Sequence, residues 1–173
     1  MDAEARLYLF IIFIFILIMF FYLIITNNSG TEFRHIIFQA VSFITTSGFT
    51  STSYDGWPSF LLITLLTMSF IGACTGSTGG GMKVMRIMLL FKLMKKELMK
   101  ILHPTAEIPI IVNENPLSEN ISHSVWNFFI LYIISYLVIS FLLLASGLDM
   151  ISAFSAVAAC INNLGPALGA VSD

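Results

Sequence analysis

The stretch FQAVSFITTSGFTS, residues 38–51, determines how the rest of the chain is interpreted. Its apolar part is typical of a helix and gives way to the polar cluster Thr45-Thr46-Ser47-Gly48. Hydrophobic segments flank it on both sides, but its own apolar part is too short to cross a bilayer. A helix that ends inside a membrane exposes backbone carbonyls, which need protein, water or an ion as partner. Because carbonyl oxygens can replace the hydration shell of a cation, the stretch predicts an ion site.

The composition places the chain in a membrane. Of its residues 57% are hydrophobic and 10% are charged, with a mean hydropathy of +0.92, whereas a soluble domain carries about 25% charged residues. Most of the Lys and Arg residues fall between Lys83 and Lys100, which the positive-inside rule assigns to the cytoplasm. The two cysteines, Cys74 and Cys160, are far apart in sequence and predict neither a disulfide framework nor a metal site.

The first part of the chain predicts two membrane spans with a short re-entrant helix between them. Residues 7–26 carry no charge and, at roughly 1.5 Å per residue, reach about 30 Å, one hydrocarbon thickness. Residues 31–45 predict the re-entrant helix, and residues 46–49 its polar end. Residues 58–100 predict the second span, broken in its middle by the glycine-rich run 72–81 because glycine disfavours helix.

The second part of the chain repeats this order. Residues 103–120 are polar and contain prolines, which predicts a cytoplasmic connector. Residues 125–145 form another uncharged span, and residues 149–160 predict a second re-entrant helix that ends in the polar segment 161–166. With the basic cluster inside, both re-entrant helices enter from the outer face, as a pore requires.

The repeat has two possible registers. A displacement of 117 residues lays Glu32, Ile44, Thr46 and Gly48 on Asp149, Ile161, Asn163 and Gly165. A displacement of 116 residues instead aligns Phe38, Ala40 and Val41 with Phe154, Ala156 and Val157. We therefore expect a pore unit in residues 1–102 and an incomplete second unit in residues 121–173. Since two re-entrant loops cannot surround an ion, we expect the chain to be part of a longer polypeptide.

Three motifs carry a resemblance to a known family. They are TTSGFTS (45–51), GACTGSTGGGMKVMRI (72–87) and INNLGPALG (161–169). In this order and spacing they resemble the Trk/Ktr/HKT superfamily of potassium transporters, and most closely the TrkH-like membrane subunit of the bacterial Trk potassium-uptake system. The resemblance covers nearly all 173 residues, which look like the third and most of the fourth of four span–pore loop–span units.

The resemblance implies an all-α membrane protein of potassium-channel-like fold that takes up K⁺ and is not an enzyme. It implies a selectivity filter formed by Thr46, Ser47, Gly48, Phe49, Asn163, Leu164 and Gly165. The K⁺ ligands would be the backbone carbonyls of these residues other than Phe49. It implies a gate beneath the filter formed by Gly72, Cys74, Thr75, Gly76, Ser77, Thr78, Gly79, Gly80 and Gly81.

The resemblance also predicts where the protein lies and what it contacts. It implies a multi-pass protein of the bacterial cytoplasmic (inner) membrane, in contact with the lipid bilayer and with the remaining pore units of the transporter. It implies a homodimer with a cytosolic nucleotide-binding regulatory subunit. K⁺ is the transported ion, and neither a covalently bound cofactor nor a nucleic-acid partner is expected.

The same motifs have other possible functions, which their residues favour or exclude. The run 72–81 is not a phosphate-binding loop, because Met82 separates Gly81 from Lys83 and Val84 stands where Ser or Thr would hold magnesium. Tight helix packing through its small residues stays open. Glu32 and Asp149 either attract cations or cap helices, with equal support. For the whole chain, an ion-coupled secondary transporter with broken helices and a non-conducting membrane scaffold remain alternatives.

Overall fold

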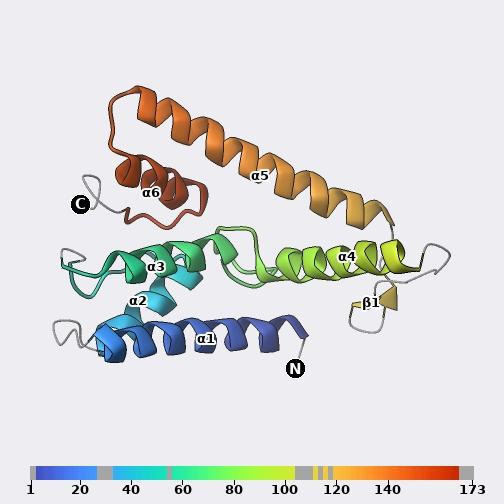
Figure 1. Cartoon of the computed structure of the whole chain (residues 1–173), viewed down its shortest axis with the longest axis horizontal. Helices are drawn as coiled ribbons and strands as arrows, with labels where there is room; N and C mark the ends of the chain where they lie inside the picture. Colours follow the sequence, from blue (N-terminus) through green and yellow to red (C-terminus); the bar gives the residue numbers. More distant parts are fainter. Residues whose placement is uncertain are drawn as a thin grey trace.

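The computed structural model describes residues 3–26, 33–53, 56–103, 111–112, 115–116 and 119–167. These residues form helices α1 (Ala3–Thr26), α2 (Phe33–Thr45), α3 (Ser59–Ile71), α4 (Val84–Leu102), α5 (Glu119–Ala145) and α6 (Met150–Ile161). Between α4 and α5, β1 (Ile111–Val112) pairs antiparallel with β2 (Asn115–Pro116). Apart from this two-residue pair the described chain is helical, as Figure 1 shows. The all-α architecture predicted from the sequence is confirmed.

Within the described ranges, two helices are long and apolar enough to cross a membrane. They are α1 and the part of α5 from Ile121 to Ala145. At about 1.5 Å per residue each exceeds the hydrocarbon thickness of about 30 Å. About half of their residues are exposed, including Phe13 on α1 and Leu131 on α5, and few are buried. Apolar side chains along the whole length of a helix are typical of a membrane span.

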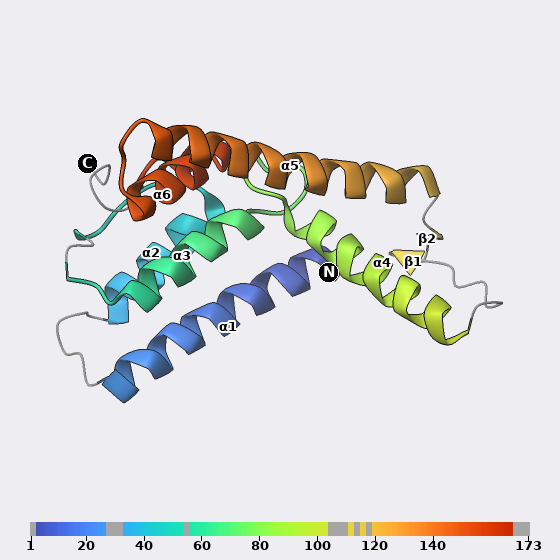
Figure 2. The same ribbon diagram turned by 45° about the horizontal axis from the view of Figure 1, so that its top comes forward.

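The short helices α2 and α6 lie at one end of the molecule. This is the end at which α1 and α5 finish and α3 begins, while α4 points toward the opposite end (Figures 1 and 2). α2 contacts both α1 and α3, and α6 contacts both α3 and α5. Both short helices therefore lie on the same side of the break between α3 and α4.

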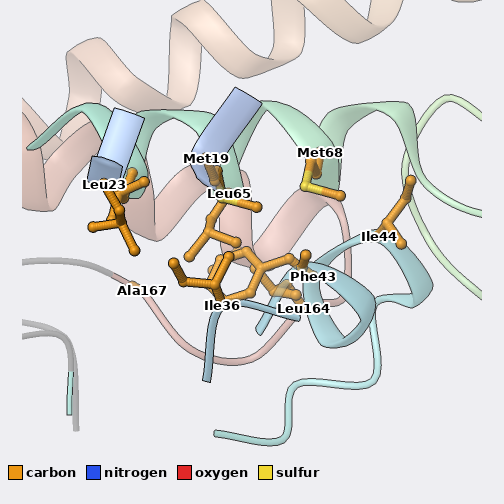
Figure 3. Close-up of a cluster of buried hydrophobic side chains, with 12 residues drawn as sticks. Met19, Leu23, Ile36, Phe43, Ile44, Leu65, Met68, Leu164 and Ala167 are labelled. Atoms are coloured by element: carbon orange, nitrogen blue, oxygen red, sulfur yellow. The ribbon is translucent and has the colours of Figure 1, made fainter. Parts of the chain in front are cut away.

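A single apolar cluster joins these helices, as Figure 3 shows. α1 contributes Met19 and Leu23, and α3 contributes Leu61, Leu65 and Met68. The amphipathic helix α2 places Ile36, Ala40, Phe43 and Ile44 between them. Ala159, Leu164 and Ala167 from the second unit complete the cluster. Because Leu164 and Ala167 follow α6, the chain after α6 is packed directly against α1, α2 and α3.

Several element bounds differ from the sequence prediction. Helix resumes at Val84 rather than Met82, because Gly81 and Lys83 both have positive φ, at 75° and 68°. α5 begins at Glu119, six residues before the predicted start of the apolar span, because the polar residues that precede the span are also helical. The two-residue strand pair lies within the predicted connector. The predicted helix start at residues 31–32 falls outside the described residues.

Candidate ion-conduction site

The helix α2 ends in a Schellman motif, a left-handed residue closed by two backbone hydrogen bonds. The Ser47 N–H donates to the Ser42 carbonyl at 3.0 Å, and the Thr46 N–H donates to the Phe43 carbonyl at 3.2 Å. Thr46 takes the left-handed position with φ of 53°, where glycine is usual. Threonine there indicates that its surroundings hold it in a conformation that costs an ordinary residue about 1–2 kcal/mol.

The helix α6 ends in the same way. The Leu164 N–H donates to the Ala159 carbonyl at 2.8 Å, and the Asn163 N–H donates to the Cys160 carbonyl at 3.2 Å. Asn163 takes the left-handed position with φ of 52°. Every equivalent atom of the two motifs is separated by 117 residues. The two helix ends therefore select the 117-residue register of the repeat over the 116-residue one.

The backbone after each motif presents carbonyl oxygens that accept no hydrogen bond from the part of the chain that the structure describes. Gly48 and Gly165 return to positive φ, at 74° and 98°, one residue beyond Ser47 and Leu164. Among the described residues, no donor reaches the carbonyl oxygens of the six residues predicted to bind K⁺: Thr46, Ser47, Gly48, Asn163, Leu164 and Gly165. The Phe49 carbonyl differs, because it accepts a hydrogen bond from Ser42 Oγ at 2.6 Å.

The two segments that follow the helix ends lie against each other at Gly48. A Cβ atom added to Gly48 would overlap the carbonyl oxygen of Leu164 and would lie 3.3 Å from Cδ of Pro166. Gly48 therefore combines a positive φ with a contact that leaves no room for a side chain. The structure thus brings together the two predicted filter segments, which are more than one hundred residues apart in the sequence.

The glycine loop between α3 and α4 touches both helix ends. The Gly80 N–H donates to Thr46 Oγ1 at 2.9 Å. A Cβ atom added to Gly80 would overlap the carbonyl oxygen of Asn162, the residue before the left-handed Asn163. The loop residues predicted to form a gate are thus in contact with both predicted filter segments through Gly80.

The loop folds back onto the end of α3. The Met82 N–H donates to the Phe70 carbonyl at 3.0 Å, and the Val84 N–H donates to the Ala73 carbonyl at 3.2 Å. At the far side of the loop, the Thr75 N–H donates to Oε1 of Glu4, a buried residue of α1, at 2.6 Å. No local pattern indicates this role for Glu4, because its partner is a backbone amide 71 residues away.

Asn162 connects three helices beneath the second filter segment. Its side chain is fully buried; Nδ2 donates to Ser69 Oγ of α3 at 3.0 Å, and Oδ1 accepts a hydrogen bond from the Tyr132 hydroxyl of α5. Asn162 lies inside the predicted polar segment 161–166 but is not among the predicted K⁺ ligands, and neither Ser69 nor Tyr132 is a predicted site residue. Their signal is a polar side chain within an apolar segment, since such groups inside a membrane protein need partners.

The Tyr132 hydrogen bond gives a first testable prediction. Tyr132→Phe keeps the ring but leaves the buried Asn162 Oδ1 without this donor, so we expect a loss of about 1–3 kcal/mol in the free energy of unfolding. Denaturant unfolding in detergent measures it. Tyr22→Phe is the matched control, because its ring stacks on Phe60 while its hydroxyl makes no hydrogen bond with another described residue. Equal stabilities of the two variants would contradict a structural role for this bond.

Asp149 caps the start of α6. Its side chain accepts a hydrogen bond from the Ser152 N–H at 3.1 Å, and its backbone is extended, as an N-cap requires. The hydrogen bonds from Ser152 lower the pKa of the Asp149 carboxyl below its ordinary value of 3.8. Of the two roles left open by the sequence, capping is therefore observed for Asp149. Glu32 lies outside the described residues.

The cap predicts a specific pH dependence of stability. Because the folded-state pKa lies below 3.8, the carboxylate stabilises α6 above that value, and the contribution is lost as the pH falls through the folded-state pKa. Asp149→Asn retains the capping geometry but cannot titrate. We expect thermal unfolding followed by circular dichroism to show a smaller loss of stability between pH 5 and about pH 3 for this variant. Identical pH profiles would exclude a contribution from the Asp149 charge.

The sequence of this chain matches a known protein family. Residues 5–173 match the TrkH family model, described as "Cation transport protein". The chain belongs to the TrkH family. The TrkH potassium uptake protein of Vibrio parahaemolyticus is 45% identical over 98% of this chain, and that of Escherichia coli K12 is 48% identical over 79% of it. The resemblance predicted from the three motifs is confirmed.

A solved TrkH structure shares the fold of this chain. The crystal structure of the potassium transporter TrkH from Vibrio parahaemolyticus superposes with a TM-score of 0.89 at 45% identity and covers 99% of this chain. This confirms the all-helical membrane fold. The chain spans 37% of that structure and about a third of the curated TrkH relatives, at 36% and 28% of their lengths.

Proposed function

We propose that this chain forms two pore units, residues 1–102 and 121–173, of a potassium-uptake transporter. The observation that carries the proposal is the pair of equivalent helix ends, each followed by backbone carbonyls that accept no hydrogen bond from the described protein. Unpaired carbonyls at membrane depth are costly unless an ion or water satisfies them. The TrkH relatives are named potassium uptake proteins of the Trk system, which supports K⁺ as that ion.

The filter acts through backbone oxygens. Partly dehydrated K⁺ binds the carbonyls of Thr46, Ser47 and Gly48 on one side and those of Asn163, Leu164 and Gly165 on the other. Two further units of the same kind complete the ring. Several weak sites in series allow the ion to enter and to leave. Phe49 borders this filter but contributes no free carbonyl, since its oxygen is bonded to Ser42.

The glycine loop is the gate in this proposal. The segment from Gly72 to Gly81 lies directly beside both filter segments, through the contacts of Gly80 with Thr46 and Asn162. Its hydrogen bonds to the end of α3 and to Glu4 hold it in place. Conduction then requires the loop to leave this position, which breaks a small number of hydrogen bonds.

The complete transporter has further parts in this proposal. It is a multi-pass protein of the bacterial inner membrane, forms a homodimer, and works with a cytosolic nucleotide-binding regulatory subunit. The designation of the TrkH relatives as members of a Trk system supports an assembly of several components.

A chimera tests this function. This chain replaces the matching 36% of the Vibrio parahaemolyticus TrkH protein, and the chimera is expressed in bacteria that lack their own K⁺ uptake systems. We expect growth at low K⁺ and ⁸⁶Rb⁺ uptake that follows the electrical driving force linearly. Saturable uptake coupled to Na⁺ or H⁺ would indicate a secondary transporter. A folded, membrane-inserted chimera without any uptake would indicate a scaffold.

A further inference from the structure

A cavity with two basic side chains lies beside the glycine loop, on the side away from α2 and α6. It has a volume of about 530 Å³ and opens between the start of α4 and the start of α5. Its lining includes Thr75, Lys83 and Arg86 on one side and Ser124, Val125 and Phe128 on the other. The cavity shares no lining residue with the two filter segments, and Thr75 is its one lining residue from the predicted gate.

The cavity lies at the level of the inner membrane boundary. Thr75 on its wall is bonded to Glu4, in the first turn of the spanning helix α1. Ile121, also on its wall, is the first residue of the spanning part of α5. α4 begins beside the N-terminal end of α1 (Figure 2) and continues with Lys92, Lys95, Lys96 and Lys100. This is the face that the positive-inside rule assigns to the cytoplasm, where anionic lipid is concentrated.

The two basic groups are positioned without acidic partners. Within the described part of the chain, neither Lys83 nor Arg86 forms an ion pair. The Arg86 guanidinium stacks over the Phe128 ring at 4.0 Å from its centroid, which fixes its plane beside the cavity. Lys83 Nζ donates to the Ser77 carbonyl at 2.9 Å, which uses only one of its three N–H donors. Two cations without acidic partners beside a partly apolar wall favour the binding of an anion.

We propose that this cavity binds the phosphate of an anionic phospholipid headgroup. The Arg86 guanidinium and the free Lys83 donors bind the phosphate oxygens, a pairing that charge-assisted hydrogen bonds favour. The apolar wall from Val125, Phe128 and Leu89 receives the start of the acyl chains. A phosphate on the free donors leaves the Lys83 bond to the Ser77 carbonyl in place, so Lys83 links an occupied site directly to the glycine loop.

Lipid binding by the full chain tests the proposal independently of ion uptake. Native mass spectrometry of the purified chain compares dioleoyl phosphatidylglycerol with dioleoyl phosphatidylcholine, which has the same acyl chains. We expect one tightly bound phosphatidylglycerol and a preference that falls roughly tenfold or more in the Lys83→Gln/Arg86→Gln variant. Lys95→Gln/Lys96→Gln removes the same charge from a more distant part of α4 and should keep the preference.

A second cavity variant and a competition with free phosphate complete the test. Ile121→Glu places an acid at the cavity mouth without removing either cation, so it should also abolish the preference, and circular dichroism verifies its helical content. Inorganic phosphate at millimolar concentration should leave phosphatidylglycerol bound; displacement by it would assign the site to free phosphate and overturn the lipid proposal. Equal binding of both lipids, or an unchanged preference in both cavity variants, would also overturn it.

Discussion

Gly48→Ala is expected to lower the preference of the chimera for K⁺ over Na⁺ by a factor of roughly 5–30, the equivalent of one or two kcal/mol. The Cβ atom of an alanine at this position would overlap the Leu164 carbonyl oxygen. The alanine would also have to adopt the positive φ of Gly48. The left-handed conformation alone costs about 1–2 kcal/mol for a residue with a side chain. The backbone must therefore shift, and with it the carbonyls of both filter segments. Competition of Na⁺ with ⁸⁶Rb⁺ uptake measures the preference.

Gly147→Ala is the matched control for this substitution. Gly147 also has a positive φ, of 98°, but nothing lies within 4 Å of an added Cβ atom, and it is outside both filter segments. It should reproduce the conformational strain without changing selectivity. If Gly48→Ala reached the membrane in normal amounts and kept its ion preference, the assignment of residues 46–48 to the filter would be wrong.

Gly80→Ala has the second large expected effect, an increase in ion flux. Gly80 does not have a positive φ, so alanine is compatible with its backbone, but the added Cβ overlaps the Asn162 carbonyl oxygen. Overpacking of this kind costs typically about 1–3 kcal/mol. The loop relieves this overlap by moving away from the filter. The movement also breaks the hydrogen bond from the Gly80 N–H to Thr46 Oγ1. This strain destabilises the closed position of the loop, and about 1.4 kcal/mol corresponds to a factor of ten in an equilibrium. We therefore expect initial rates of ⁸⁶Rb⁺ uptake to rise several-fold.

Gly76→Ala provides the comparison within the same loop. Gly76 has open space around it, so its substitution strains the backbone without pushing the loop from the filter. Its uptake rate should stay close to that of the unsubstituted chimera. Reduced uptake by Gly80→Ala in a correctly inserted protein would show that the loop supports the open pathway instead of closing it.

The sequence predicted the elements of the fold because each carries a local signal. The uncharged runs that became α1 and α5 could be recognised from hydropathy and length alone. The glycine-rich run interrupted helix where it was expected to, since glycine disfavours helix in any context. One bound shifted where the local signal was weak, at Glu119, where polar residues extend a helix beyond its apolar span.

The hydrogen bonds that join the parts of the site could not be predicted, because they link residues far apart in the sequence. Glu4 meets Thr75 across 71 residues, and Asn162 meets Ser69 across 93. Each of these residues is an ordinary polar residue until the folded chain supplies its partner. The register of the repeat was also ambiguous from side chains, because the packing residues and the helix ends favoured different displacements. The two Schellman motifs resolve it, since backbone hydrogen bonds rather than side chains define them.

The most direct measurement of the central claim is the position of the ion itself. A structure of the chimera determined with Rb⁺ or Tl⁺ would locate bound ions by anomalous scattering. Ion density coordinated by the carbonyl oxygens of Thr46, Ser47 and Gly48 together with those of Asn163, Leu164 and Gly165 is the result we predict. Ion density elsewhere in the membrane, with these oxygens hydrogen-bonded to protein, would contradict the account.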